Sequence, residues 1–434
     1  MNPKVEKALA ILGLLVFSGV IAMASYGRGS DGAGGAEGGG SVFSKISQLL
    51  RYGYYAYTIF MLTVRLKTVI RPALRDVLIW GLMAIIVSSF LWSDFASVSL
   101  KNGRLTLLTT LFGLYLASRY TLKEQLEILA LTFGISTVFT FLYTGGLPMY
   151  GIEQGTHKGA WRGPLLHKNH LARFAAIATV PLLFAAMKAK RRRFLVWFVF
   201  VLSAIIVILT TSKTGLLVFL TLMLLVPMCR TLQSTHSVIV PILILLVLAG
   251  SSTVMWLINN WAPFLHSLGK DVTLTGRTYI WEFVIDKIKE RPWLGYGYEA
   301  FWLPGGEGEN VKFYIMLSLT QAHNGYLDVA VHLGLIGFAL WFGSLVICLI
   351  RGLIWVRAGG DLEDTWPIIY VIFLLLYNQT ESTIVETNSF FWLLYVMASF
   401  SMKRMRLVIP GAWDVPTEDK DLKDQELVEK SSPN

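Results

Sequence analysis

Three residues of this sequence, Lys213, Arg277 and His323, have side chains suited to binding an anion and to moving a proton. Lys213 lies in a polar break, Ser-Lys-Thr-Gly, between two apolar stretches, and its ammonium could bind a phosphate as a point charge. Arg277 stands in the first turn of a predicted helix. A cation is unfavourable for the helix dipole there, which indicates a role such as anion binding. His323 carries an imidazole that can accept the proton of a hydroxyl nucleophile near neutral pH.

Each of these residues also has an ordinary interpretation at a membrane boundary. Lys213 could extend its ammonium to the interface, as lysines at the ends of spans do. Arg277 could be a solvated interfacial arginine that contacts lipid headgroups. His323 could be an ordinary interfacial histidine.

Other polar residues could line the same site. Arg162, Asn169 and His170 precede an apolar stretch, and their side chains suit contact with a glycan or a phosphate. His167 and His170 have the spacing of a possible metal pair, but neither Glu nor Cys accompanies them, so we expect no metal site. The sequence indicates no other cofactor.

Two acidic residues of the last loop, Glu381 and Glu386, could supply a carboxylate base or could simply be solvent-exposed. Glu381 could also line the glycan or phosphate site. Asn324 is a further candidate for the lining of the site. Asp328 and His332 follow it on a predicted membrane helix, where ionisable groups are functional candidates but can also be polar packing groups.

Several well-known sequence signatures are absent. The chain has no Gly-x-x-x-x-Gly-Lys-Ser/Thr phosphate loop, no His-Glu-x-x-His and no Gly-x-Ser-x-Gly. ATP-driven transport by this chain alone and zinc proteolysis are therefore not expected.

Composition sets the fold class. Of 434 residues, 54% are hydrophobic and only 15% are charged, whereas soluble domains carry about 25% charged residues. These proportions exclude a disordered, collagenous, coiled-coil or disulfide-scaffold protein. The two cysteines cannot form a zinc cluster. In so apolar a chain, the net charge of +10 is more typical of basic loops that set membrane topology than of nucleic-acid binding.

Apolar stretches predict an all-α polytopic membrane protein with about twelve transmembrane helices. The predicted spans are residues 8–24, 48–64, 77–93, 104–119, 126–144, 171–187, 194–210, 215–228, 237–258, 325–349, 367–378 and 389–402. The basic loops all fall on one side if both termini are cytoplasmic. Cys229 and Cys348 then lie near the reducing face and are expected to be free thiols.

This topology predicts four regions. Residues 1–258 hold the first nine helices, 259–324 form a long outer loop, 325–402 hold the last three helices, and 403–434 form a disordered cytoplasmic tail. Within the outer loop, Trp281, Val284, Ile285 and Ile288 recur at helical spacing and predict an amphipathic helix. The sequence Arg-Pro-Trp-Leu-Gly-Tyr-Gly that begins at Arg291 is expected to end it.

Together, four segments resemble the O-antigen ligase and Wzy-type polymerase superfamily, and most of all the exopolysaccharide polymerases of the ExoQ type. They are residues 276–281, 291–302 and 322–327, with 212–215 similar to the family's Ser-Arg-Gly element. The resemblance covers roughly residues 165–400. It implies a GT-C-like glycosyltransferase of the bacterial inner membrane, which acts at the periplasmic face without metal or nucleotide.

The resemblance also implies roles for single residues. Arg277 matches the arginine that binds the donor diphosphate, and His323 matches the histidine proposed to activate the acceptor. Lys213 stands where the ligases usually have arginine, which keeps the charge but loses the bidentate fork.

The family implies an enzyme that polymerises exopolysaccharide or O-antigen repeat units. Its donor would be an undecaprenyl-diphosphate-linked glycan and its acceptor a glycan hydroxyl, within the lipid bilayer. A chain-length regulator is a candidate partner. An O-antigen ligase with lipid A-core as acceptor is the alternative within this class. A secondary transporter or lipid flippase is the alternative outside it, although the inverted repeats typical of transporters are not visible. No nucleic-acid partner is expected.

Overall fold

The computed structural model describes most of the chain. The residues it describes are 2–20, 42–154, 157–231, 245–257, 277–311, 320–357 and 361–402. The chain divides into two compact units, Met1–Lys403 and Arg404–Asn434. The second unit, the rest of the predicted tail and residues 259–276 of the predicted outer loop lie outside the described residues. The predicted division into four regions therefore stays a prediction.

Helices are the regular secondary structure of the described residues, where the only β feature is one antiparallel bridge between Ile152 and Trp161. The helices are α1 (Pro3–Phe17), α2 (Val42–Val64), α3 (Leu66–Ala73), α4 (Val77–Ser88), α5 (Ala96–Arg119), α6 (Leu122–Gly146), α7 (Pro148–Gly151), α8 (Lys168–Lys188), α9 (Arg193–Leu209), α10 (Lys213–Thr231), Leu245–Leu257, α12 (Arg277–Glu290), α14 (Gly325–Arg357), α15 (Trp366–Tyr377) and α16 (Phe390–Ser401). Short 3-10 turns are η2 (Ser89–Leu91), η3 (Glu307–Asn310) and η4 (Leu362–Thr365). The predicted all-α class is confirmed for this part of the chain.

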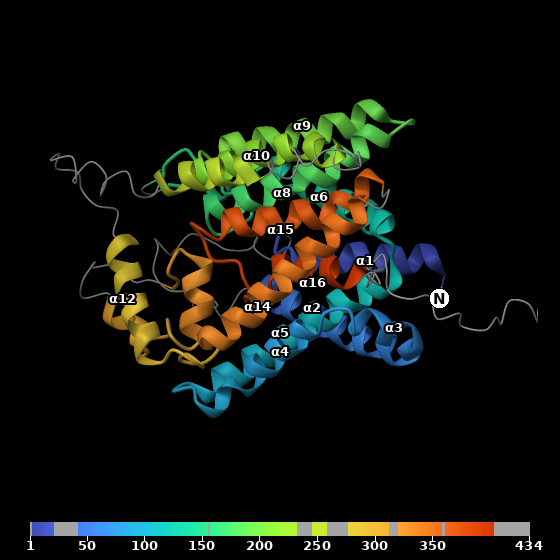
Figure 1. The fold of residues 1–434 in the computed structure, drawn as a ribbon. Helices are drawn as coiled ribbons and strands as arrows, with labels where there is room; N and C mark the ends of the chain where they lie inside the picture. Colours follow the sequence, from blue (N-terminus) through green and yellow to red (C-terminus); the bar gives the residue numbers. More distant parts are fainter. Residues whose placement is uncertain are drawn as a thin grey trace, which may run out of the picture. The chain divides into compact units, whose positions relative to one another are not determined.

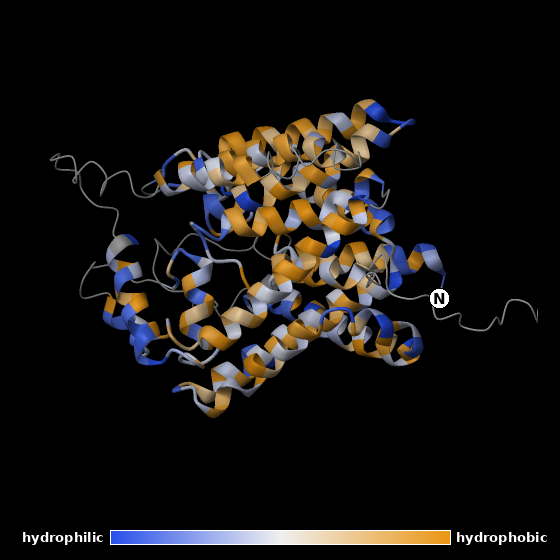
Figure 2. Cartoon of the chain, in the orientation of Figure 1, coloured by the Kyte–Doolittle hydropathy of each residue, from blue (hydrophilic) through white to orange (hydrophobic). Residues whose placement is uncertain are grey.

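Three helices, α6, α8 and α14, are each long and apolar enough to cross a membrane. The pair formed by α3 and the segment Val77–Leu91, bent by 94°, passes the same test as one broken crossing. The shorter helices α9, α10, Leu245–Leu257 and α16 are also apolar. Figure 2 shows mainly hydrophobic residues along α8, α9 and α10. The chain is a multi-pass helical membrane protein, and the number of twelve crossings stays a prediction.

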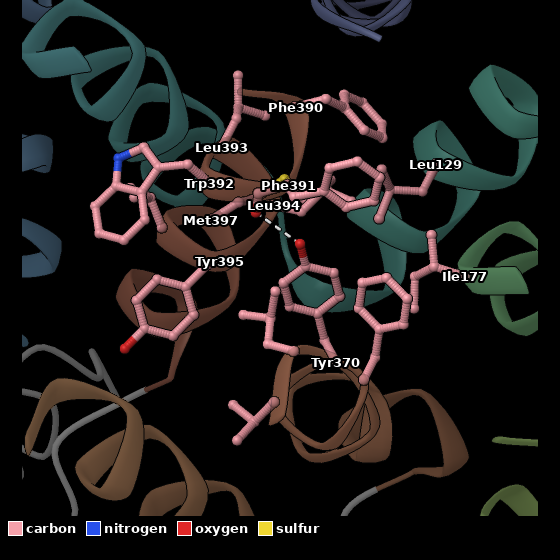
Figure 3. Close-up of a cluster of buried hydrophobic side chains, with 14 of the residues drawn as sticks. Leu129, Ile177, Tyr370, Phe390, Phe391, Trp392, Leu393, Leu394, Tyr395 and Met397 are labelled. Carbon is pink, nitrogen blue, oxygen red and sulfur yellow. Dashed lines mark hydrogen bonds between the residues drawn. The ribbon is translucent and has the colours of Figure 1, made fainter. Parts of the chain in front are cut away.

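The centre of the larger unit is built from α15 and α16. Every residue of α16 is buried, and so is nearly all of α15, which explains why these short helices are apolar on all faces. In Figure 3 their aromatic rings lie against Leu129 of α6 and Ile177 of α8. The hydroxyl of Tyr370 donates to the carbonyl of Phe391 at 2.6 Å, so this buried polar group is satisfied.

Neighbouring helices pack closely around this centre. α8 lies alongside α9 and α10, and α12 lies against α14 (Figure 1). α5 and α16 approach so closely that a Cβ at Gly113 would come within 2.7 Å of Val396. Glycine is needed at such a contact because any side chain would push the two helices apart.

α8 and α15 run antiparallel and are tied together at both ends. Lys188, at the end of α8, pairs with Glu363 just before α15. At the other end, the hydroxyl of Tyr377 donates to the carbonyl of Asn169 at 2.7 Å. The second of these ends carries the candidate site.

Basic residues of different predicted inner loops share the buried carboxylate of Glu6. Arg65 and Arg119 each approach this carboxylate to 3.0 Å. Because Arg65 follows α2 and Arg119 ends α5, the pairs place these two loops at the same end of the bundle. The shared end agrees with the charge pattern of the sequence.

α14 is interrupted near its start, at Gly334, where φ is 66° and ψ is −174°. Residues 292–297, which follow α12, insert at this break and replace helical hydrogen bonds. The inserted backbone bonds run from Tyr296 to Val331, from Gly297 to His332 and from Leu335 to Pro292, at 2.9, 3.0 and 2.7 Å. α12 ends at Glu290, so the predicted end of this helix is confirmed.

We expect Gly334→Ala to lower the thermal unfolding midpoint of the purified protein. A Cβ at this position would overlap the backbone of Trp293, and its φ/ψ region is one that essentially only glycine occupies. The expected cost is about 2 kcal/mol or more. Gly53→Ala in α2 is the matched control, because a Cβ there meets nothing within 4 Å. Equal unfolding midpoints for Gly334→Ala and Gly53→Ala would contradict the insertion of residues 292–297 at Gly334.

Candidate functional site

Glu381 lies at the centre of the candidate site, in the loop between α15 and α16. It is only 4% exposed. Its carboxylate accepts a hydrogen bond from the side-chain amide of Asn169 at 2.6 Å. A guanidinium nitrogen of Arg277 lies 3.8 Å from one oxygen, and Nδ1 of His323 lies 3.5 Å from the other. The alternative that Glu381 is merely a solvent-exposed loop acid is therefore wrong.

The partners of Glu381 come from the starts of three helices. The ring of His167 caps α8 by accepting from the amide of Asn169 at 3.3 Å, which places Asn169 in the first turn. Arg277 is the first residue of α12, and His323 stands two residues before α14. Asn169, Arg277 and His323, which the sequence predicts as site residues, are thus brought from distant segments to one carboxylate.

The start of α14 is fixed by polar contacts. The side chain of Asn324 accepts from the amides of Tyr326 and Leu327 at 3.1 and 3.3 Å, so Asn324 caps this helix. The amide of Gly325 donates to the carbonyl of Asn378 at 2.9 Å, and a Cβ at Gly325 would overlap the Asn378 side chain. These contacts set the position of the residue just before them, His323.

His323 has a left-handed backbone, with φ of 51°. This conformation is uncommon outside glycine and is held here by its neighbours. The indole of Trp281 donates to the carbonyl of Ala322 at 3.0 Å, and the Ala322 amide donates to the carboxylate of Asp328 at 3.0 Å. Nε2 of Gln321 lies 3.4 Å from Nδ1 of the imidazole.

Asp328 acts as a packing group rather than as an exposed acid. It is 6% exposed, and its carboxylate accepts from the indole of Trp302 at 2.7 Å and from the hydroxyl of Ser382. Nε2 of His332 is buried and has no hydrogen-bond partner among the described residues. Of the two interpretations left open for Asp328, the contacts favour the structural one.

Burial raises the pKa of Glu381, but its charged neighbours outweigh that effect. The hydrogen bond and the charge of His323, together with the charges of Arg277 and His170, lower this pKa to about 2. Glu381 is therefore a carboxylate at neutral pH, and a carboxylate beside Nδ1 can orient an imidazole so that Nε2 is the free base.

α12 packs on α14 through a stripe of apolar residues. Ile280 and Val284 are buried, with Trp281 and Ile288 packed beside them. Ile285 is 41% exposed, because the residues buried against α14 follow positions four apart from Ile280.

Lys213 and Arg162 stand apart from these contacts. Lys213 begins α10 and is exposed. Its neighbour Thr214 accepts a hydrogen bond at 3.4 Å from Thr380, next to Glu381, so Lys213 borders the site. Nε of Arg162 donates to the carbonyl of Tyr150 at 2.9 Å, and this contact does not bring it to Glu381.

Arg173 and Glu386 lie near the site, although the sequence offers little reason to place them there. Arg173, one helical turn after Asn169, was not singled out, although an ionisable residue inside an apolar stretch is itself a functional signal. Its guanidinium lies 4.0 Å from Glu386. Burial raises the pKa of Glu386 to about 7; nearby carboxylates add to the rise and the charge of Arg173 opposes it.

Within the described ranges, no group of three or more His, Cys, Asp or Glu side chains is arranged to hold a metal ion. The rings of His167 and His170 have centroids 6.3 Å apart. Cys229 and Cys348 are both buried and free, as the sequence predicts.

Comparison with known proteins extends the resemblance seen in the sequence. Residues 198–342 match the family model described as O-antigen ligase. This segment is similar to the O-antigen ligase family. The family segment contains Lys213, Arg277 and His323 but ends before Glu381.

A curated protein is also similar to part of this chain. A stretch of 145 residues is 33% identical to the exopolysaccharide production protein ExoQ of Rhizobium meliloti (strain 1021). The match covers 28% of this chain and 33% of that protein, so the chain spans about a third of the relative's length.

We expect Glu381→Gln to lower the unfolding midpoint at neutral pH, because Arg277 and His323 lose their carboxylate partner. The pKa of Glu381 is depressed from 4.5 to about 2, so its contribution is present above about pH 4.5 and is lost as pH falls toward 2. The destabilisation should be about 2 to 3 kcal/mol at pH 7. The gap between wild type and variant should narrow on acidification.

Thermal unfolding in detergent, followed from pH 7 down to about pH 3, measures this gap. Glu282→Gln is the matched control, because Glu282 is exposed on α12. A gap between wild type and Glu381→Gln that does not change with pH would contradict the depressed pKa.

Proposed function

We propose that this protein is a GT-C-like membrane glycosyltransferase. It moves a glycan from an undecaprenyl-diphosphate carrier to a sugar hydroxyl at the periplasmic face of the bacterial inner membrane. The proposal is carried by one observation: a single buried carboxylate, Glu381, holds both the arginine and the histidine of the O-antigen ligase resemblance. An anion-binding cation beside a candidate base is what such a transfer needs.

The proposed reaction is an inverting displacement without metal. The acceptor hydroxyl oxygen attacks the anomeric carbon of the donor sugar, and the bond from that carbon to the diphosphate oxygen breaks. The hydroxyl proton passes to Nε2 of His323, while undecaprenyl diphosphate leaves with the bonding electrons. Arg277 stabilises the charge that develops on the diphosphate. Glu381 orients the imidazole.

The remaining candidates have supporting roles in this proposal. Lys213, exposed at the start of α10, adds a second cation for the diphosphate. Asn169 and His170, in the first turn of α8, line the glycan or phosphate path, and Arg162 is assigned to its outer part. Asn324 contributes by capping α14.

The proposed orientation puts this site outside and both termini in the cytoplasm. It is supported by the shared contacts of Arg65 and Arg119, which gather at one end of the bundle, and by the site's place at the opposite end of α8 from Lys188. The long loop 259–324 would then cover the glycan, with 403–434 as a cytoplasmic tail.

Polymerisation of exopolysaccharide or O-antigen repeat units is the preferred activity. The 33% identity to an exopolysaccharide production protein favours it over ligation to lipid A-core. A chain-length regulator is a proposed partner in that case. A secondary transporter or flippase is disfavoured, because the polar side chains gather at helix starts on one face rather than at the middle of the spans.

We expect Arg277→Ala to abolish transfer and Arg277→Lys to restore it only in part. Loss of a close donor to a developing charge costs a few kcal/mol, about 10²-fold or more in rate. Lysine keeps the charge but not the bidentate fork. Lys213→Arg should be tolerated. Transfer is measured with purified protein and a synthetic lipid-linked donor, and normal polymer formation by folded Arg277→Ala protein would remove the diphosphate-binding role.

We expect His323→Ala to remain folded and to bind donor, but to lower turnover by roughly 10²- to 10⁴-fold, the usual contribution of general-base catalysis. Turnover of the wild type should fall as the imidazole becomes protonated at lower pH, because a charged imidazole cannot accept a proton. The same transfer assay tests this. Near-normal turnover of His323→Ala would exclude His323 as the base.

A further inference from the structure

Arg173 on α8 contacts the loop 378–389 at two places and the start of α16 at a third. Its guanidinium donates to the carbonyl of Ser382 at 3.2 Å and lies 4.0 Å from the carboxylate of Glu386. The same group lies over the ring of Phe391, 4.8 Å from its centroid. The arginine therefore spans the loop from the residue after Glu381 to the first turn of α16.

The position of Arg173 on α8 links it to the candidate site. Arg173 follows Asn169 by four residues, so both side chains lie on one face of the helix. Asn169 binds the carboxylate of Glu381, and Arg173 binds the backbone of the next residue, Ser382. One face of α8 thus holds the loop at two adjacent points.

The loop that Arg173 holds has a strained backbone. Val385 and Asn388 are left-handed, with φ of 51° and 57°. A β-branched residue in this region is a genuine outlier and persists only where its surroundings hold it. The two polar contacts of Arg173, with Ser382 and Glu386, lie on either side of Val385, and the hydroxyl of Tyr298 donates to the Val385 carbonyl at 2.5 Å.

We propose that Arg173 is a positioning residue that holds the loop 378–389 so that Glu381 faces His323. The proposal rests on the proposed transfer reaction only for its rate readout. Only a planar guanidinium can reach the Ser382 carbonyl, approach Glu386 and lie over the ring of Phe391 at the same time. The role therefore depends on the shape of the side chain as well as on its charge.

Arg173→Lys separates shape from charge. It keeps a cation on α8 but removes the fork. It leaves the charged and titratable groups around His323 in place: Glu381 of the loop, Arg277 of α12, His170 of α8 and Asp328 of α14. We expect kcat to fall about 10- to 100-fold, as for a small misplacement of catalytic groups, with an unchanged KM for the donor. A carboxylate partner favours the charged form of an imidazole. If Glu381 no longer faces His323 in the variant, the acid limb of the pH–rate profile should therefore move to lower pH.

The test uses the full-length purified protein in lipid nanodiscs, with transfer from the synthetic lipid-linked donor followed across pH. Arg104→Lys is the matched control, because Arg104 is exposed on α5. Glu386→Gln is the second variant and should lower kcat in the same direction. If Arg173→Lys does not accumulate as folded protein, the kcat of Glu386→Gln tests the proposal instead.

A readout independent of turnover separates this proposal from the proposed function. The imidazole signal of His323, assigned by its loss in His323→Gln, is titrated by NMR in wild type and in Arg173→Lys. A shift of the titration to lower pH supports positioning by Arg173 even if the wild type transfers no glycan. A wild-type profile in both readouts, or a rise in donor KM alone, would overturn the proposal.

Discussion

The candidate site depends on the burial of one carboxylate. An ionised carboxylate removed from water is costly unless opposite charges and hydrogen bonds surround it. Glu381 is 4% exposed and meets this requirement through Asn169, Arg277 and His323. These partners belong to the starts of α8, α12 and α14, which are far apart in the sequence. The buried carboxylate of Glu381 therefore joins the starts of three helices.

The break in α14 also helps to hold Arg277 and His323 in place. Opening a helix at Gly334 frees backbone groups that must find new partners within a membrane protein. Residues 292–297 supply them, and these residues follow directly after α12. The indole of Trp281 adds a second link from α12 to the residue before His323. Arg277 and His323 are thus carried by two helices joined through backbone hydrogen bonds, so their separation does not depend on side-chain contacts alone.

Sequence patterns predicted the parts of this site but not how they are joined. The apolar stretches, the end of α12 and the cation and imidazole are local features, visible in residue types and spacing. The burial of Glu381 is not local: its loop is polar and reads as exposed until α8 and α14 are placed against it. The break at Gly334 was equally hidden, because an isolated glycine in an apolar run is compatible with an unbroken helix.

Backbone strain gives a physical reason for placing the site on these loops. His323 and, on the other segment, Val385 and Asn388 are left-handed residues of the two segments that meet where Glu381 contacts His323. Such conformations persist only when surrounding contacts hold them, and here Asp328, Tyr298 and Arg173 provide those contacts. The proposed transfer, in which charge develops on a diphosphate, would work best when the charged groups of the site are fixed before the substrate arrives. The strained loops, held from rigid helices, are the part of this fold that can supply that fixed arrangement.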